Sequence, residues 1–201
     1  MFLRKGRIIV ALFFMSLYFG SRPAYGGDDF SVPPSPIGFS LFEPVQYPSA
    51  DAEVIGFRLS IFHARNANVT GLDIGALISA VDGDVFGMEF SGLVNTVGSS
   101  SGSLQIAGIA NNCYDNFYGL QISGIANMAG GEVAGGQIGC FNSSGNMSGI
   151  QIGAFNKADN AVGCQIGVVN VAESMAGIQI GLLNFIKDSS YPCLPIANAK
   201  F

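Results

Sequence analysis

The sequence is dominated by a tandem repeat built on the core G-x-Q-I-G-x-x-N. Aligned on that core, one polar position recurs at successive spacings of 15, 16, 16, 16, 16, 14, 14 and 14 residues. Its nine members are Arg58, Asp73, Glu89, Gln105, Gln121, Gln137, Gln151, Gln165 and Gln179. A fixed period of this kind is the signature of stacked repeat architectures. The chain must therefore fold one structural unit repeatedly over residues 56–190.

The apolar positions within each unit predict one coil of a β-solenoid. In the unit that begins at Ile150, apolar residues follow at Ile152, Phe155, Ala158 and Ala161. A step of two is the strand period, and steps of three carry the chain around corners, so one lap can face a common interior. The recurrent glycines and isoleucines oppose a helix. We predict an all-β solenoid of about nine coils of 14–16 residues with N- and C-terminal caps.

This pattern also predicts which side chains face inward. It places the isoleucine pairs, such as Ile150 and Ile152, in the interior and the glutamine between them on the surface. We therefore expect an exposed interaction ladder that consists of Gln105, Gln121, Gln137, Gln151, Gln165 and Gln179. The asparagines that close each unit are expected to bond to one another from coil to coil. His63 and Ile78 take the asparagine position in the first two units.

Three central units have one extra residue before the asparagine. These units begin at Met88, Leu104 and Leu120, and each contains a glycine in the lengthened spacer. A glycine-assisted bulge, repeated in register over three coils, accounts for the extra residue.

The ends of the chain differ in composition from the array. Residues 1–26 have the features of a signal peptide: a basic start, an apolar stretch over 8–19 and a small-x-small site at Ala24-Tyr25-Gly26. The sequence predicts a proline-rich linker over 27–36, an N-terminal cap over 37–55 and a C-terminal cap over 191–201. After cleavage, 5 basic and 14 acidic residues would remain of the 9 and 14 in the whole sequence. An acidic chain of this kind is not expected to bind nucleic acid.

Residues for catalysis, cofactor binding or metal binding are scarce. The chain has a single histidine, His63, and its four cysteines match no zinc-ligand spacing and select no disulfide pair. Asp73 and Glu89 would lie on adjacent coils, but Arg58 precedes them, which favours a charge-neutralising surface ladder. We predict no catalytic, cofactor or metal site and no enzymatic activity.

Three units have the sequences G-I-Q-I-G-A-F-N (149–156), G-C-Q-I-G-V-V-N (163–170) and G-I-Q-I-G-L-L-N (177–184). In these motifs the chain resembles the bacterial surface-repeat proteins with tandem G-x-Q-[ILV]-G-x-x-N units. The resemblance extends to P-V-Q-Y-P (44–48) and L-P-I-A-N-A-K-F (194–201). It implies an exported bacterial protein at the cell surface and assigns no activity.

Together these features predict an exported, non-enzymatic surface or extracellular repeat scaffold with an adhesive or interaction-mediating role. Its partner would be another surface molecule or a second copy. The alternative is a small outer-membrane β-barrel that acts as a pore or membrane anchor, because ten strands can be counted and the chain ends in Phe201. The expected location is the cell surface, the outer membrane or the extracellular space.

Overall fold

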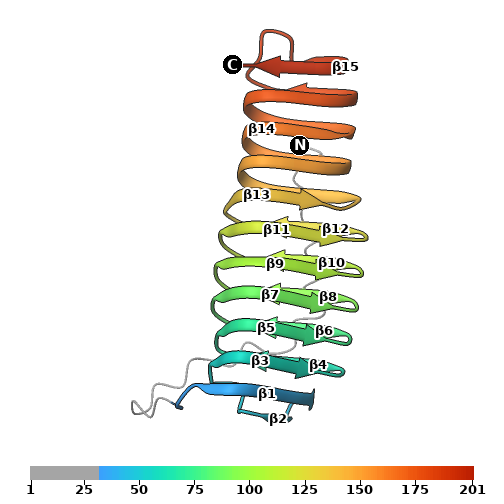
Figure 1. Ribbon diagram of the computed structural model, residues 1–201. Coiled ribbons are helices and arrows are strands. Elements are labelled where there is room, and N and C mark those ends of the chain that lie inside the picture. The colour runs from blue at the N-terminus through green and yellow to red at the C-terminus, as the bar shows by residue number, and fades with distance from the viewer. Residues whose placement is uncertain (1–31) are drawn as a thin grey trace. The chain divides into compact units, whose positions relative to one another are not determined.

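The computed structural model describes residues 32–201, and these residues form strands and turns (Figure 1). The predicted signal peptide, and all of the predicted linker except 32–36, lie outside the described residues. The strands are β1 (Ser35–Phe42), β2 (Val45–Tyr47), β3 (Val54–Ser60), β4 (His63–Asn66), β5 (Val69–Gly75), β6 (Ile78–Val81), β7 (Val85–Ser91), β8 (Val94–Val97), β9 (Ser101–Ala107), β10 (Ala110–Cys113), β11 (Phe117–Ser123), β12 (Ala126–Ala129), β13 (Glu132–Ile138), β14 (Phe141–Ile186) and β15 (Cys193–Lys200).

The strands wind into a β-solenoid. The long strands β3, β5, β7, β9, β11 and β13 pair in parallel, one above the other. The short strands β4, β6, β8, β10 and β12 stack in the same way along another wall. β14 follows the remaining coils without a break, because the 14-residue units lack the extra corner residue. The predicted all-β solenoid is confirmed. The alternative barrel is wrong for residues 32–201, since membrane barrels are built from antiparallel neighbours.

One glycine column allows the coils to approach closely. Gly149 has a φ of 140°, and a Cβ added there would lie 1.9 Å from the carbonyl oxygen of Gly135 in the preceding coil. Gly135 meets Gly119 in the same way, at 2.0 Å. Only glycine adopts this backbone conformation without strain. Glycine is therefore favoured by both the backbone conformation and the coil spacing in eight of the nine coils, and Ser103, which aligns with Gly87 and Gly119, is the exception.

We expect Gly149→Ala to lower the free energy of unfolding by roughly 2–3 kcal/mol, because it adds strain and a backbone clash at one position. Urea unfolding followed by circular dichroism measures the change. Ser148→Ala, at the exposed neighbouring position, is the matched control and should leave the midpoint unchanged. Equal midpoints for the two variants would contradict this role of the glycine.

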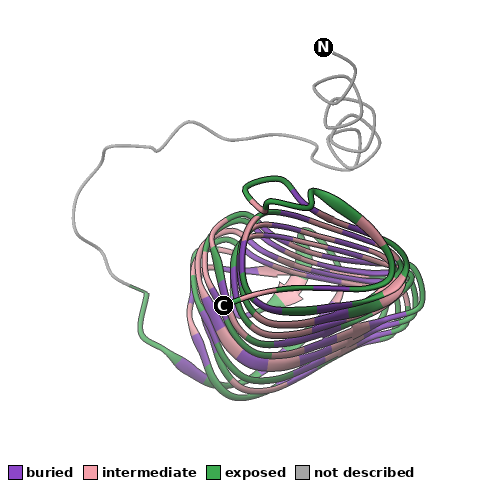
Figure 2. Cartoon of the chain, turned by 90° about the horizontal axis from the view of Figure 1, so that it is seen from above, coloured by how far each residue is buried: buried purple, intermediate pink, exposed green. Residues whose placement is uncertain are grey.

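The interior of the solenoid has an apolar part and a polar part, and Figure 2 shows the buried positions recurring from coil to coil. One apolar cluster includes Val54, Val85 and Phe117, and a second includes Met147 and Ile186. The polar part consists of the glutamine and asparagine positions of the repeat, which are fully buried. The core is therefore held both by apolar contacts and by side-chain hydrogen bonds.

Both ends of the solenoid are capped. At the N-terminal end β1 pairs in parallel with β3 and forms a hairpin with the three-residue β2. At the C-terminal end β15 lies antiparallel on the last part of β14, with Gln179 opposite Asn198. These strands cover the terminal coils, as predicted. Residues 32–201 contain no helix long and apolar enough to cross a membrane.

Two details of the predicted register are wrong. Ala64 and Ser79, not His63 and Ile78, align with Asn95. The extra corner residue predicted for three units is also present in the first two, so their asparagine position shifts by one residue.

Candidate interaction surface

The glutamines predicted to be exposed lie inside the solenoid. Gln105, Gln121, Gln137, Gln151, Gln165 and Gln179 are all completely buried. From Gln121 onward, each side-chain amide donates to Oε1 of the glutamine in the preceding coil, at 2.7–2.8 Å. The prediction of an exposed glutamine ladder is therefore wrong. The physical reason is that a stack of amides can satisfy its own donors and acceptors, which removes the usual cost of burying them.

The asparagines form a second buried ladder. From Asn95 to Asn170, each amide donates to Oδ1 of the asparagine in the following coil, at 2.8–2.9 Å. Each also donates to a backbone carbonyl of the next coil, as Asn156 does to Ile166 at 2.8 Å. The predicted stacking of asparagines from coil to coil is confirmed. Because the glutamines donate backward and the asparagines forward, the two rows of amides point in opposite directions.

Charged residues replace glutamine at the N-terminal end of the first ladder. The guanidinium of Arg58 donates to both carboxylate oxygens of Asp73, at 2.8 and 2.6 Å, and both side chains are about 1% exposed. Ser79 donates its hydroxyl to Asp73, and Glu89 accepts a hydrogen bond from Gln105. The sequence analysis predicts this charged cluster on the surface, and that prediction is wrong, because the cluster lies in the interior and forms the start of the glutamine ladder.

Glu89 is the unusual member of this cluster. Its side chain is completely buried, and within residues 32–201 its Oε1 has no hydrogen-bond partner. Burial, and to a lesser extent the neighbouring Asp73, raise the pKa of Glu89 to about 8, although Gln105 and Arg58 act in the opposite direction. Glu89 is therefore mainly protonated at neutral pH, which avoids a second negative charge beside Asp73.

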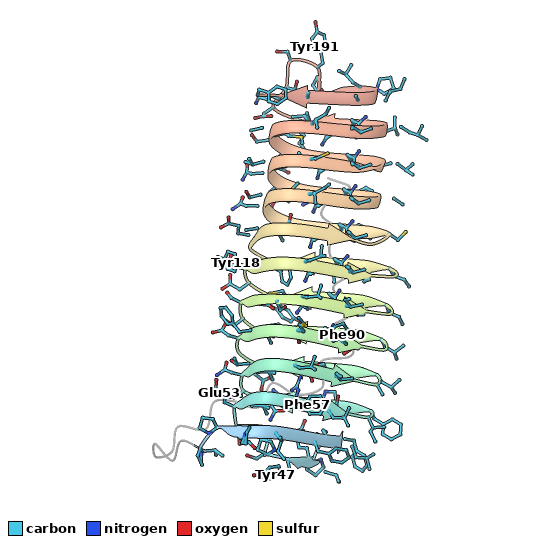
Figure 3. The ribbon with its side chains drawn as sticks, viewed as in Figure 1. Tyr47, Glu53, Phe57, Phe90, Tyr118 and Tyr191 are labelled. Carbon is cyan, nitrogen blue, oxygen red and sulfur yellow. The ribbon has the colours of Figure 1, made fainter. Side chains whose placement is uncertain are left out.

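The side chains on either side of each glutamine point outward. We call this outer surface of β3, β5, β7, β9, β11, β13 and the matching parts of β14 the ladder face. One column of the ladder face consists of Leu59, Ile74, Phe90, Ile106, Ile122, Ile138, Ile152, Ile166 and Ile180. A second column consists of Phe57, Leu72, Met88, Leu104, Leu120, Gly136, Ile150, Cys164 and Ile178. Phe57 and Phe90, labelled in Figure 3, come from β3 and β7.

A third column widens the ladder face toward the start of each strand. Its larger members are Ile55, Phe86, Tyr118 and Val162, which are between 46% and 63% exposed. None of the residues in the three columns is charged. Exposed apolar patches of this extent mark interaction sites on soluble proteins. The ladder face is therefore the candidate functional surface of the described chain.

The charged side chains lie on other parts of the solenoid. Exposed or half-exposed ion pairs join Arg65 to Asp82 at 2.9 Å and Lys187 to Glu173 at 2.5 Å. Subtracting the four basic and two acidic residues of 1–31 from the totals leaves five basic and twelve acidic residues in 32–201. These charged side chains therefore lie outside the ladder face, where large apolar side chains such as Phe62, Ile125 and Leu182 are also exposed.

The reactive side chains do not converge on a site. His63 is half-buried on β4, and burial lowers its pKa. All four cysteines are free: Cys113 is buried, Cys164 is half-buried on the ladder face, and Cys140 and Cys193 are exposed. Burial raises the pKa of the Cys113 thiol to about 11. Among residues 32–201, no group of three or more histidine, cysteine or carboxylate side chains could hold a metal ion.

The sequence does not predict the ladder face, because hydrophobicity assigns its isoleucines to the core. A signal for the correct assignment is present in the repeat itself. The glutamine position is uniform over six units, as a hydrogen-bonded ladder requires, whereas in the same six units the position before it changes among Leu, Gly, Ile and Cys. A position that tolerates such different sizes is easier to place on a surface than in a close-packed core.

Comparison with known protein families, curated proteins and solved structures gave no match to this chain.

Proposed function

We propose that the protein is an exported, non-enzymatic repeat scaffold that assembles with a macromolecular partner through the ladder face. The observation that carries this proposal is an uncharged apolar surface that continues over all nine stacked positions of the repeat. The paired strands beneath it and the two buried amide ladders hold that surface rigid, so little conformational freedom is lost on binding. The leader-like residues 1–26 and the resemblance to surface-repeat proteins support export to the cell surface.

The two-residue variant Ile122→Lys/Ile152→Lys tests the proposal, because it places two charges on the ladder face and alters no buried side chain. The full chain is expressed in a bacterial host, and surface proteins are crosslinked on intact cells. We expect the processed wild-type protein in a complex larger than the monomer and the variant as a monomer.

The matched control is Asn112→Lys/Ser143→Lys, which adds the same two charges at half-exposed positions on the wall formed by the short strands. It should form the same complex as the wild type. If all three proteins give the same species, or if the chain keeps Met1 and stays in the cytoplasm, the proposal is wrong.

A further inference from the structure

We propose that the partner of the ladder face is a second copy of this chain, packed face to face. This inference rests on the proposed function, because it identifies the molecule that covers the same surface. Its first support is size. Nine stacked positions at about 4.8 Å and five residues of strand at about 3.3 Å give a footprint of roughly 700 Å². A standard interface buries about 800 Å² per partner, so one copy of the face is the right size for another.

Charge also favours a second copy. A two-fold interface brings each surface patch against itself, so any charge on the patch meets its own like charge. The ladder face has no charged side chain in its three columns. The rest of the described chain has twelve acidic and five basic residues, which favours an uncharged partner face over an anionic lipid surface.

The surface shape of the ladder face suits packing between two β-sheets. Six consecutive coils present isoleucine in the same column, namely Ile106, Ile122, Ile138, Ile152, Ile166 and Ile180. Side chains of one shape at the coil spacing form a regular ridge, and two such ridges can interdigitate as the inner faces of packed sheets do.

Glycines in the second and third columns leave little empty space. A Cβ added at Gly102 would lie 2.8 Å from the ring of Phe86, and one added at Gly136 would lie 2.9 Å from Cδ1 of Leu120. The neighbouring side chains therefore cover these positions, and the ladder face stays level along its length. A level face can meet its own copy over many coils at once.

Sedimentation equilibrium of the purified processed protein, over a hundredfold range of concentration, tests the inference. We expect a dimer for the wild type and for Asn112→Lys/Ser143→Lys. Ile122→Lys/Ile152→Lys should have a dissociation constant at least 100-fold higher. Circular dichroism of the three proteins should be the same, which separates lost association from lost folding.

Cys164 provides a second measurement without any substitution, because its half-buried thiol lies on the ladder face. Its rate of alkylation should fall about tenfold between dilute and concentrated protein. The exposed Cys193, on the C-terminal cap, should react at the same rate throughout. A dimer that leaves the Cys164 rate unchanged, or that persists in the Ile122→Lys/Ile152→Lys variant, uses another surface and overturns the inference.

The two proposals fail in different ways. The purified protein could be monomeric at every concentration while the crosslinked complex on cells still depends on the ladder face. In that case the partner is another molecule, and only the proposal of a second copy is wrong. If neither the purified protein nor the protein on cells associates through this face, both proposals are wrong.

Discussion

Replacing Glu89 with Gln should stabilise the fold, and the gain should increase as the pH rises from 4.5 to 8. The pKa of Glu89 is about 8 in the folded chain and has an ordinary value near 4.5. Between these values the folded state binds the proton more tightly than the unfolded state, so the free energy of unfolding of the wild type falls with rising pH. The stabilisation from the protonated carboxyl is complete below about pH 4.5 and is lost as the pH rises to and through 8.

At about 1.4 kcal/mol per pH unit, this loss is on the order of 4 kcal/mol at pH 8. A glutamine at position 89 carries no charge at any pH, can accept the hydrogen bond from Gln105, and extends the ladder toward Asp73. Glu89→Gln should therefore match the wild type near pH 4 and exceed it by several kcal/mol near pH 8. Urea unfolding at a series of pH values measures the difference.

Glu132→Gln is the control, because Glu132 is an exposed glutamate on β13. It should not reproduce the pH-dependent gain. A Glu89→Gln variant that is less stable than the wild type at pH 8 would show that the cluster around Arg58 needs a second carboxylate, and would contradict the account of Glu89.

The architecture follows from the spacing of the repeat, but the inner and outer sides of its strands do not. The regular recurrence of glutamine and glycine predicts stacked coils, and the asparagine positions predict a bonded stack. In a strand with period two, however, the pattern Ile150-Gln151-Ile152 fits either orientation, because a shift of one residue exchanges the two faces. Hydrophobicity favours the isoleucines inside, and that criterion fails here.

Hydrophobicity fails as a criterion for the inward side because coil stacking places identical side chains at hydrogen-bond distance. A single buried glutamine would leave unpaired polar atoms, whereas Gln151 donates to Gln137 at 2.8 Å and accepts from Gln165 at 2.7 Å. These hydrogen bonds require the neighbouring coils, so the sequence of a single unit does not predict them. The corner residues Ala158 and Ala161 are predicted correctly to lie in the interior, because the residues beside them, Lys157, Asp159 and Asn160, are charged or polar and hydrophobicity points the alanines inward.

The burial of the charged cluster could not be predicted from a single unit either. Arg58, Asp73 and Glu89 share one column in the sequence alignment, and their order suggested a surface network. Their burial follows only from their membership in the glutamine column. Once that column is inside, the bidentate ion pair and the raised pKa of Glu89 follow from desolvation.

The orientation of the strands decides both the core and the proposed interaction surface, and one pair of variants tests it. Gln165→Glu and Ile166→Glu introduce the same side chain at adjacent positions, one fully buried in the amide ladder and one 37% exposed on the ladder face. Gln165→Glu would remove the donor to Gln151 and place a carboxyl in the interior. We expect it to cost about 4 kcal/mol at pH 7.

The measurement is the free energy of unfolding in urea for the two variants and the wild type. The protein concentration is kept low enough for the wild type to be monomeric, so that lost association does not affect the comparison. We expect a wild-type-like value for Ile166→Glu and a loss of about 4 kcal/mol for Gln165→Glu. A large loss for Ile166→Glu together with a tolerated Gln165→Glu would place the isoleucines inside and contradict the account.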